Sequence, residues 1–212
     1  LATAHSNLGG ILLDLGKYKE AESSTRLAIQ LNPNLAIAHS NLGNILLDLG
    51  KFKEAESSTR LAIQLNPNLA TAHSNLGIIL QRLGKLKEAE SSTRLAIELN
   101  PNFTNAHLNL GNILRDLGKL QEAFDSYLKV IEIKPTTYNI YPSITRFLKD
   151  SDLLQLNKLK LKNILNILLK RNDVSHKELF KAFNFLYRNK IINNLGGLNS
   201  DSSKSELIIN DK

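Results

Sequence analysis

Two polar residue types recur at a fixed spacing in the first two thirds of the chain. Four histidines stand 34 positions apart, at His5, His39, His73 and His107. Four asparagines follow them two positions later, at Asn7, Asn41, Asn75 and Asn109. Imidazole is a common metal ligand and acid–base group, whereas an amide offers two donors and one acceptor that can pair with a peptide unit. The elements that carry these residues decide which chemistry is possible.

The segment 36–69 sets this spacing, because it recurs along the chain. The segment 2–35 differs from it at three of its 34 positions, and the segment 70–103 differs at seven. The segment 104–137 keeps the first half of the pattern and diverges in the second. A proline lies near the end of each copy, at Pro33, Pro67, Pro101 and Pro135. A period of this length is typical of stacked repeats, in which neighbouring units bury each other's apolar faces.

Each copy is predicted to fold as two helices. In 36–69 the apolar residues follow the spacing of one helix face, at Ala38, Leu42, Ile45, Leu46 and Leu49. Gly50 is expected to end this first helix in the left-handed conformation. A second helix is predicted over about 52–64, and Pro67 ends it. Pairs four residues apart on the second helices are expected on a solvated outer surface, at Glu22–Arg26, Glu56–Arg60 and Glu90–Arg94.

The residues inside the unit resemble the tetratricopeptide repeat, a helix–turn–helix of 34 residues. Within 36–69 the matching positions are Leu42, Gly43, Ala55, Ala62 and Pro67. The position of the family's tryptophan holds histidine in all four copies. The aromatic position of the second helix holds threonine in three copies and tyrosine in the last, at Thr25, Thr59, Thr93 and Tyr127. The resemblance implies an all-α, right-handed solenoid of four repeats over 1–137, followed by a C-terminal helical segment.

The resemblance also implies that the four asparagines line the concave groove of the array. They are similar to the asparagine series of the O-GlcNAc transferase repeat domain, which grips the backbone of extended peptides. The same helix phase implies groove neighbours at Asn44, Asn112, Asp48, Arg82 and Asp116. The alternative is that the asparagines only hydrate the groove or bond a neighbouring turn.

Metal binding and catalysis are not favoured by these patterns. Histidines on successive helices, whose axes stand about 8–10 Å apart, do not converge within the roughly 2.0–2.2 Å that one zinc ion requires. The sequence contains no nucleophile–base pair and no phosphate-binding glycine loop, so we predict no enzyme activity and no cofactor for this segment. Carboxylate-clamp repeats, which bind chaperone C-termini, are also disfavoured, because Ser6, Ser40 and Ser74 stand where a clamp lysine would be.

The segment 138–192 is expected to be a degenerate repeat or a helical cap. Helices are predicted over about 142–149 and 152–170. A third helix, ending near 191, is predicted behind the capping box of Ser175 and Glu178. Residues 193–212 have a linker-like composition, or they begin a truncated domain.

Charge separates the two parts of the chain, whose total net charge is +7. Residues 1–135 hold 14 basic and 13 acidic side chains, whereas 136–212 hold 13 and 7. Solvated lysines explain the basic tail better than specific nucleic-acid contact, since no RNA-binding signature with interleaved aromatics is present. No apolar run of about 18 residues is present, so no membrane span is predicted. The absence of cysteine fits a reducing compartment, and a cytoplasmic location is expected.

Two functions from different classes remain. The first is a protein–protein interaction scaffold that binds an extended peptide or a partner surface in the groove. The alternative is the substrate-recruiting arm of a larger glycosyl-, methyl- or sulfotransferase whose catalytic domain lies beyond residue 212. The chain opens at Leu1, which aligns with the last residue of a repeat, so we expect a fragment of a larger bacterial protein. The sequence leaves the partner and the oligomeric state open.

Overall fold

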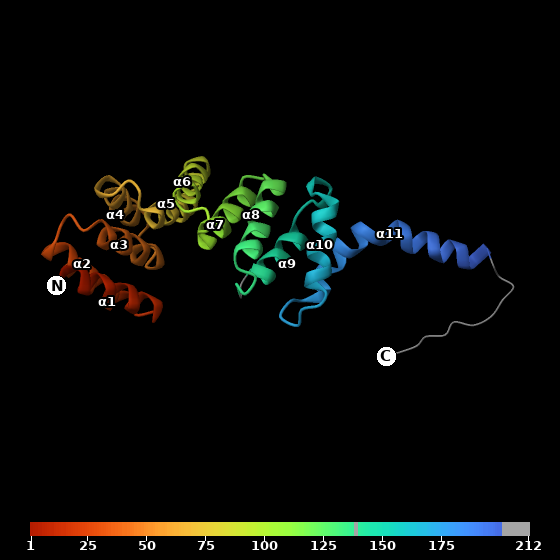
Figure 1. The fold of residues 1–212 in the computed structure, drawn as a ribbon, viewed down its shortest axis with the longest axis horizontal. Helices are drawn as coiled ribbons and strands as arrows, with labels where there is room; N and C mark the ends of the chain where they lie inside the picture. Colours follow the sequence, from red (N-terminus) through yellow and green to blue (C-terminus); the bar gives the residue numbers. More distant parts are fainter. Residues whose placement is uncertain (138–139, 201–212) are drawn as a thin grey trace. The chain divides into compact units, whose positions relative to one another are not determined.

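Every regular element in the described residues is a helix, which confirms the all-α prediction. The computed structural model of the chain describes residues 1–137 and 140–200, with side chains placed as far as 188. The chain divides into two compact units, and the second begins at Tyr141 (Figure 1). The first unit holds four helix pairs, α1 (Ala2–Asp14) with α2 (Tyr18–Leu31), α3 (Ala36–Asp48) with α4 (Phe52–Leu65), α5 (Ala70–Arg82) with α6 (Leu86–Leu99), and α7 (Thr104–Asp116) with α8 (Leu120–Ile133).

A glycine with left-handed backbone follows the first helix of each repeat. Gly50 has a φ of +73°, and its N–H donates to the Leu47 carbonyl at 3.0 Å. The N–H of Lys51 donates to the Leu46 carbonyl at 2.8 Å, so the last carbonyls of α3 find partners. The prediction for Gly50 is confirmed, and the equivalent glycines have φ values of +72° to +75°, at Gly16, Gly84 and Gly118.

The two helices of a repeat cross where their residues are smallest. A Cβ placed on Gly43 of α3 would clash with the Thr59 side chain on α4, and it would stand 3.3 Å from the Ala55 carbonyl oxygen. Thr59 and Ala55 are fully buried. In the fourth repeat the ring of Tyr127 takes the place of the threonine and lies directly against Gly111. The crossing therefore accepts either residue opposite the glycine, but it does not accept a side chain on the glycine itself.

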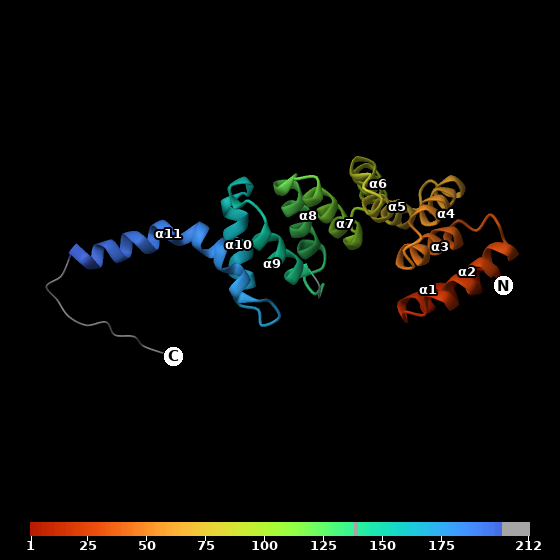
Figure 2. The same cartoon turned by 180° about the vertical axis from the view of Figure 1, so that it is seen from behind.

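Neighbouring repeats bury each other's apolar faces. One core cluster joins Leu42, Leu46 and Ala55 of the second repeat to Ile79 of the third, and Ile29 of the first repeat packs against it. Each second helix packs on the first helix of the next repeat, and successive first helices pack on one another. The second helices therefore lie on the outer side of the array, and the helix pairs can be followed in order in both views of this unit (Figures 1 and 2).

The second unit is also helical. α9 (Ile140–Asp150) confirms the short helix predicted over 142–149 and extends it at both ends. α10 (Lys158–Leu168) packs on α11 (His176–Ser200). The apolar contacts of α10 come from one stripe, which is buried at Leu161, Ile164, Leu165 and Leu168.

Residues 152–170 do not form one helix, and that prediction is wrong. The chain first makes a 3-10 turn, η1 (Leu153–Gln155), and only then enters α10. Asp152 caps η1 and Asn157 caps α10, each by accepting a hydrogen bond from a backbone N–H of the turn that follows it. Such local side-chain bonds compete with a continuous helix, so the apolar spacing alone overestimates its length.

α11 continues beyond its expected end near 191 and runs to Ser200. The stretch 193–212 was expected to be a linker or the start of a truncated domain. Its first part is helical as far as Ser200, and 201–212 lie outside the described residues. The linker prediction gave too much weight to the glycines of this stretch. Glycine inside a helix costs roughly 1 kcal/mol relative to alanine, which weakens the helix but does not end it. Among the described residues, none of the helices combines the length and the apolar character that crossing a membrane requires.

Two adjacent glycines of α1 provide a matched test of the helix crossing. A Cβ on Gly9 would clash with Thr25, whereas a Cβ on Gly10 would meet nothing within 4 Å. We expect Gly9→Ala to lower the free energy of unfolding by about 1–3 kcal/mol through overpacking. We expect Gly10→Ala to raise it by roughly 0.5–1 kcal/mol, because alanine is the better helix former. Urea denaturation measures both changes, and effects of the same sign would contradict the assigned crossing.

Candidate functional site

In each of the last three repeats, one asparagine links neighbouring first helices. Asn41 Nδ2 on α3 donates to Ser6 Oγ on α1 at 3.1 Å. The same contact follows at the next two steps, from Asn75 to Ser40 at 3.4 Å and from Asn109 to Ser74 at 3.0 Å. The serines are buried and these asparagines are half-buried. Asn41 Nδ2 also donates to the Ser6 carbonyl oxygen at 3.3 Å. The amide nitrogen of each of these asparagines is thus engaged inside the array, in a contact between helices that the sequence did not predict.

The predicted groove residues lie on one face of the first helices, which we call the asparagine face. Its members are separated by three and then four positions within a repeat, the spacing of one side of a helix. They are Asn7, Asn41, Asn44, Asp48, Asn75, Arg82, Asn109, Asn112 and Asp116. Asn7, Asp48 and Arg82 are exposed and Asn44 is half-buried. Partial desolvation by the surrounding protein raises the pKa of the Asp48 carboxyl.

Two members of the asparagine face are engaged by other side chains. Asn112 Oδ1 accepts a hydrogen bond from the Tyr127 hydroxyl at 2.9 Å. Burial raises the pKa of Tyr127 to about 12, so the hydroxyl keeps its proton at neutral pH. Asp116 accepts from Gln81 Nε2 at 2.6 Å and pairs with Arg115 at 3.0 Å. A ligand that binds Asn112 or Asp116 has to compete with these side-chain contacts. Asp48 and Arg82 are exposed to it directly.

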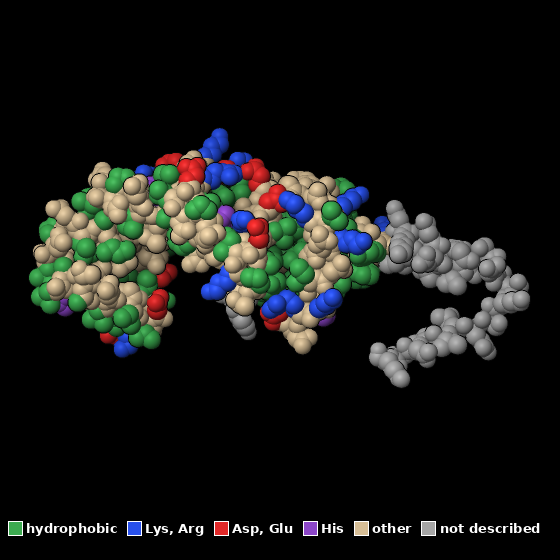
Figure 3. All heavy atoms as spheres, in the orientation of Figure 1, with side chains coloured by type: hydrophobic (Ala, Val, Ile, Leu, Met, Phe, Trp, Pro, Cys, Tyr) green, Lys and Arg blue, Asp and Glu red, His purple; other side chains and the backbone are tan. Residues whose placement is uncertain are grey.

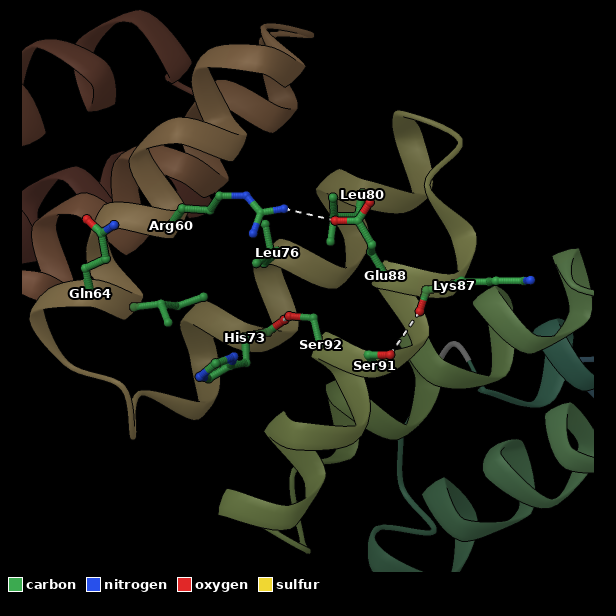
Figure 4. Close-up of a pocket in the computed structure, with 10 residues that line it drawn as sticks. Arg60, Gln64, His73, Leu76, Leu80, Lys87, Glu88, Ser91 and Ser92 are labelled. Atoms are coloured by element: carbon green, nitrogen blue, oxygen red, sulfur yellow. Dashed lines mark hydrogen bonds and ion pairs between the residues drawn. The ribbon is translucent and has the colours of Figure 1, made fainter.

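A second surface, which the sequence did not predict, lies in each repeat between its first and second helices, and from the second repeat onward the preceding second helix also lines it. The third repeat contains a cleft of ≈ 570 Å³, with Leu76 and Leu80 among the residues that line it. Figure 4 shows these residues, with the Arg60 side chain reaching across toward Glu88. Equivalent clefts of ≈ 510, 460 and 440 Å³ occur in the first, second and fourth repeats. One feature of the sequence could have indicated these clefts. Histidine stands at the family's tryptophan position, and its smaller ring fills less of the space.

In the second, third and fourth repeats, the cleft histidine contacts the loop that precedes it. His73 Nε2 lies 2.8 Å from the carbonyl oxygen of Pro67. The same contact recurs at the neighbouring loops, between His39 and Pro33 at 2.8 Å and between His107 and Pro101 at 2.9 Å. A carbonyl oxygen can only accept, so Nε2 of each ring carries the proton. Within 1–137 and 140–200, no group of three or more His, Cys, Asp or Glu side chains is placed to hold a metal ion.

A charge network ties each second helix to the next repeat. The Glu56 carboxylate accepts from Arg60 on the same helix at 2.9 Å and from Lys85 of the next repeat at 3.0 Å. Arg60 also reaches Glu88 of the next repeat at 3.2 Å. Equivalent networks surround Glu22 and Glu90, and acidic and basic side chains are intermixed around α6 (Figure 3). The predicted same-helix pairs are confirmed, and the contacts between repeats are additional.

These carboxylates stay ionised although they are largely covered. The Glu56 side chain is 15% exposed. Burial opposes its ionisation, but hydrogen bonds from Lys85 and Arg60 outweigh that effect and hold the pKa of this carboxyl below 4.5. The pKa values of Glu22 and Glu90 are lowered by the same balance of causes.

The comparisons with known proteins identify the family. Models described as tetratricopeptide repeat match residues 2–35, 36–69, 70–103 and 104–137. The chain therefore belongs to the tetratricopeptide repeat family. The comparison with curated proteins found no match.

Several solved structures share this fold. A structure described as the functional characterisation of PilF from Pseudomonas aeruginosa is 18% identical, with a TM-score of 0.71 over 94% of this chain and 90% of that one. The first repeat domain of Spaghetti (RPAP3), bound to the HSP90 peptide SRMEEVD, is 30% identical over 55% of this chain and 93% of that one, with a TM-score of 0.52. YrrB, described as having an unusual peptide-binding site, is 20% identical over 93% and 92%, with a TM-score of 0.54.

Acid should weaken the array through the covered carboxylates. Their pKa values in the folded chain lie below the ordinary value of 4.5. Their contribution to the free energy of unfolding is therefore complete above about pH 4.5 and is lost as the pH falls through the folded pKa values. The triple variant Glu22→Gln/Glu56→Gln/Glu90→Gln should be less stable than wild type near pH 7, and it should lose less stability between about pH 6 and pH 3.

Urea denaturation across this pH range measures the difference. Glu98→Gln is the matched control, because Glu98 is exposed and makes no ion pair within the described part of the chain. The assignment fails if the triple variant and wild type lose stability in parallel as the pH falls.

Proposed function

We propose that this tetratricopeptide repeat protein is an interaction scaffold that binds an extended peptide along the asparagine face. The repeats form a continuous array of helix pairs, and the predicted contact residues all lie on its first helices. The ligand proposed here is a polypeptide main chain, because the repeated group of this face is a neutral amide rather than a charged or apolar side chain.

The observation that carries this proposal is the fixed orientation of one amide per repeat. At Asn75 and Asn109 the bond from Nδ2 to a buried serine uses one of the two amide hydrogens, whereas Asn41 Nδ2 donates to both Ser6 Oγ and the Ser6 carbonyl oxygen. Asn75 and Asn109 keep a second hydrogen for a ligand, and all three asparagines keep the Oδ1 acceptor. Because the amide is held before a ligand arrives, less side-chain freedom is lost on binding.

The spacing of the repeats suits an extended chain. Packed helices stand about 8–10 Å apart, and an extended peptide advances roughly 3.3 Å per residue. One asparagine would therefore meet the main chain about every third residue. The exposed charges of Asp48 and Arg82 occupy equivalent positions in the second and third repeats. They have opposite signs, so they would favour opposite charges on the bound peptide.

Two of the similar structures support a peptide as the ligand. The RPAP3 domain was solved with an HSP90 peptide, and YrrB is described by its peptide-binding site. A substrate-recruiting arm of a transferase would use the same contacts, and it would differ only in the fate of the bound chain.

The first test replaces the asparagines. The triple variant Asn41→Ala/Asn75→Ala/Asn109→Ala removes three amides, and each neutral hydrogen bond is worth about 0.5–1.5 kcal/mol. Affinity for peptides selected from a library on the wild type should fall about ten- to a thousandfold, at roughly 1.4 kcal/mol per decade. The loss should be similar for peptides of different sequence, because the main chain is bound. Fluorescence anisotropy with labelled peptides measures it.

A serine variant separates binding from stability. Ser6→Ala/Ser40→Ala/Ser74→Ala breaks the same three contacts between repeats but leaves the amides in place. Both variants should lose a comparable amount of stability, whereas only the asparagine variant should lose most of its affinity. The proposal is wrong if the two variants bind the selected peptides equally well.

A further inference from the structure

We propose that the outer face of the first three repeats is a second binding site, which takes an acidic segment of a partner protein that carries apolar side chains. The site consists of one stripe on each second helix, which we call the lysine–leucine stripe. Its residues are Lys19, Ser23 and Leu27 on α2, Lys53, Ser57 and Leu61 on α4, and Lys87, Ser91 and Leu95 on α6. The site does not depend on the proposed function, because that function uses the first helices.

The stripe is one surface on each helix. Its members follow at intervals of four positions, so they lie on the same side. All of them are exposed. The leucines are the largest apolar groups of the stripe, and Leu27, Leu61 and Leu95 are 39%, 38% and 38% exposed. Successive repeats thus present three copies of a lysine and, two helical turns further along the same side, an exposed leucine.

The lysines of the stripe are uncommitted positive charges. Both carboxylates of α4 are already bound by cations, Glu54 by Arg26 and Glu56 by Arg60 and Lys85. Lys53, in contrast, forms no ion pair within the described residues. The same is true there of Lys19 and Lys87, so the stripe carries three positive charges with no partner in the array. Charge complementarity therefore favours an anionic ligand.

The clefts along the second helices receive the apolar part of such a ligand. Leu61 and Lys53 line the cleft of the second repeat together with Leu42 and Leu46. The cleft of the third repeat places Lys87 beside Leu76 and Leu80, and the lysine extends away from the cleft in Figure 4. Volumes of ≈ 460 and 570 Å³ fall within the range of about 300–1,000 Å³ that is usual for ligand sites. An apolar side chain can enter each cleft while neighbouring carboxylates meet the lysines.

The fourth repeat marks the end of the site. Its equivalent positions hold Gln121, Asp125 and Lys129 on α8, so the lysine and the leucine are both lost. Gln121 Nε2 donates to Asp125 Oδ1 at 2.9 Å, and Asp125 lines the cleft of this repeat. The proposed contact therefore spans the first three repeats and no more.

The probe is a fluorescently labelled 12-residue peptide of glutamates interrupted by three phenylalanines. It should bind the whole chain, and a peptide with serine in place of phenylalanine should bind at least tenfold more weakly. Lys19→Glu/Lys53→Glu/Lys87→Glu should lower the affinity for the probe at least tenfold, and Leu27→Ser/Leu61→Ser/Leu95→Ser should do the same. All six positions are exposed, and circular dichroism verifies that the variants fold.

Two controls decide the outcome. Lys162→Glu/Lys170→Glu/Lys177→Glu makes the same change in net charge at exposed lysines of the second unit, and its affinity should stay within twofold of wild type. The asparagine triple variant should also keep its affinity for this probe. The inference is overturned if both lysine variants lose affinity equally, because net charge alone would then explain binding. It is also overturned if the serine-containing peptide binds as tightly as the phenylalanine-containing probe. The same conclusion follows if only the asparagine variant loses affinity for the probe.

Discussion

A hairpin of 34 residues cannot bury its own apolar face, and the rest of the structure depends on that constraint. The core around Leu42 and Leu46 is complete only because Ile29 of the preceding repeat and Ile79 of the following one reach it. The glycine at each helix crossing lets the two helices of a repeat approach closely enough to offer one face to a neighbour. Stability is therefore shared between repeats, and each repeat has to meet the next in the same way.

Identical stacking turns every repeated polar residue into an aligned series. The serine–asparagine contacts run along the first helices, the glutamate–lysine–arginine networks run along the second, and the stripe lysines lie beside those networks without carboxylate partners within the described residues. The first two series join repeats to one another. A ligand that spans several repeats gains from any series that keeps unused hydrogen-bonding or charged groups, because each further contact is then intramolecular.

The sequence predicts the helices of the first unit well, because period, glycine and proline act locally. Gly50 and Pro67 fix the ends of α3 and α4 without reference to the rest of the fold. The contacts of Asn41 with Ser6 and of Glu56 with Lys85 were missed, since they join residues 35 and 29 positions apart and depend on how repeats stack. The clefts were missed because they arise between helices. In the second unit, one helix was predicted over 152–170 because the apolar spacing is regular there. The caps at Asp152 and Asn157, which divide this stretch, were therefore missed.

The central claim is that the aligned amides of the first helices hold a peptide main chain. A structure of the whole chain with a library-selected peptide, by crystallography or by NMR with an isotope-labelled peptide, tests it most directly. The account predicts an extended peptide along α3, α5 and α7, with its backbone groups hydrogen-bonded to Asn41, Asn75 and Asn109. A selected peptide bound elsewhere, with no hydrogen bond to these three side chains, would contradict it.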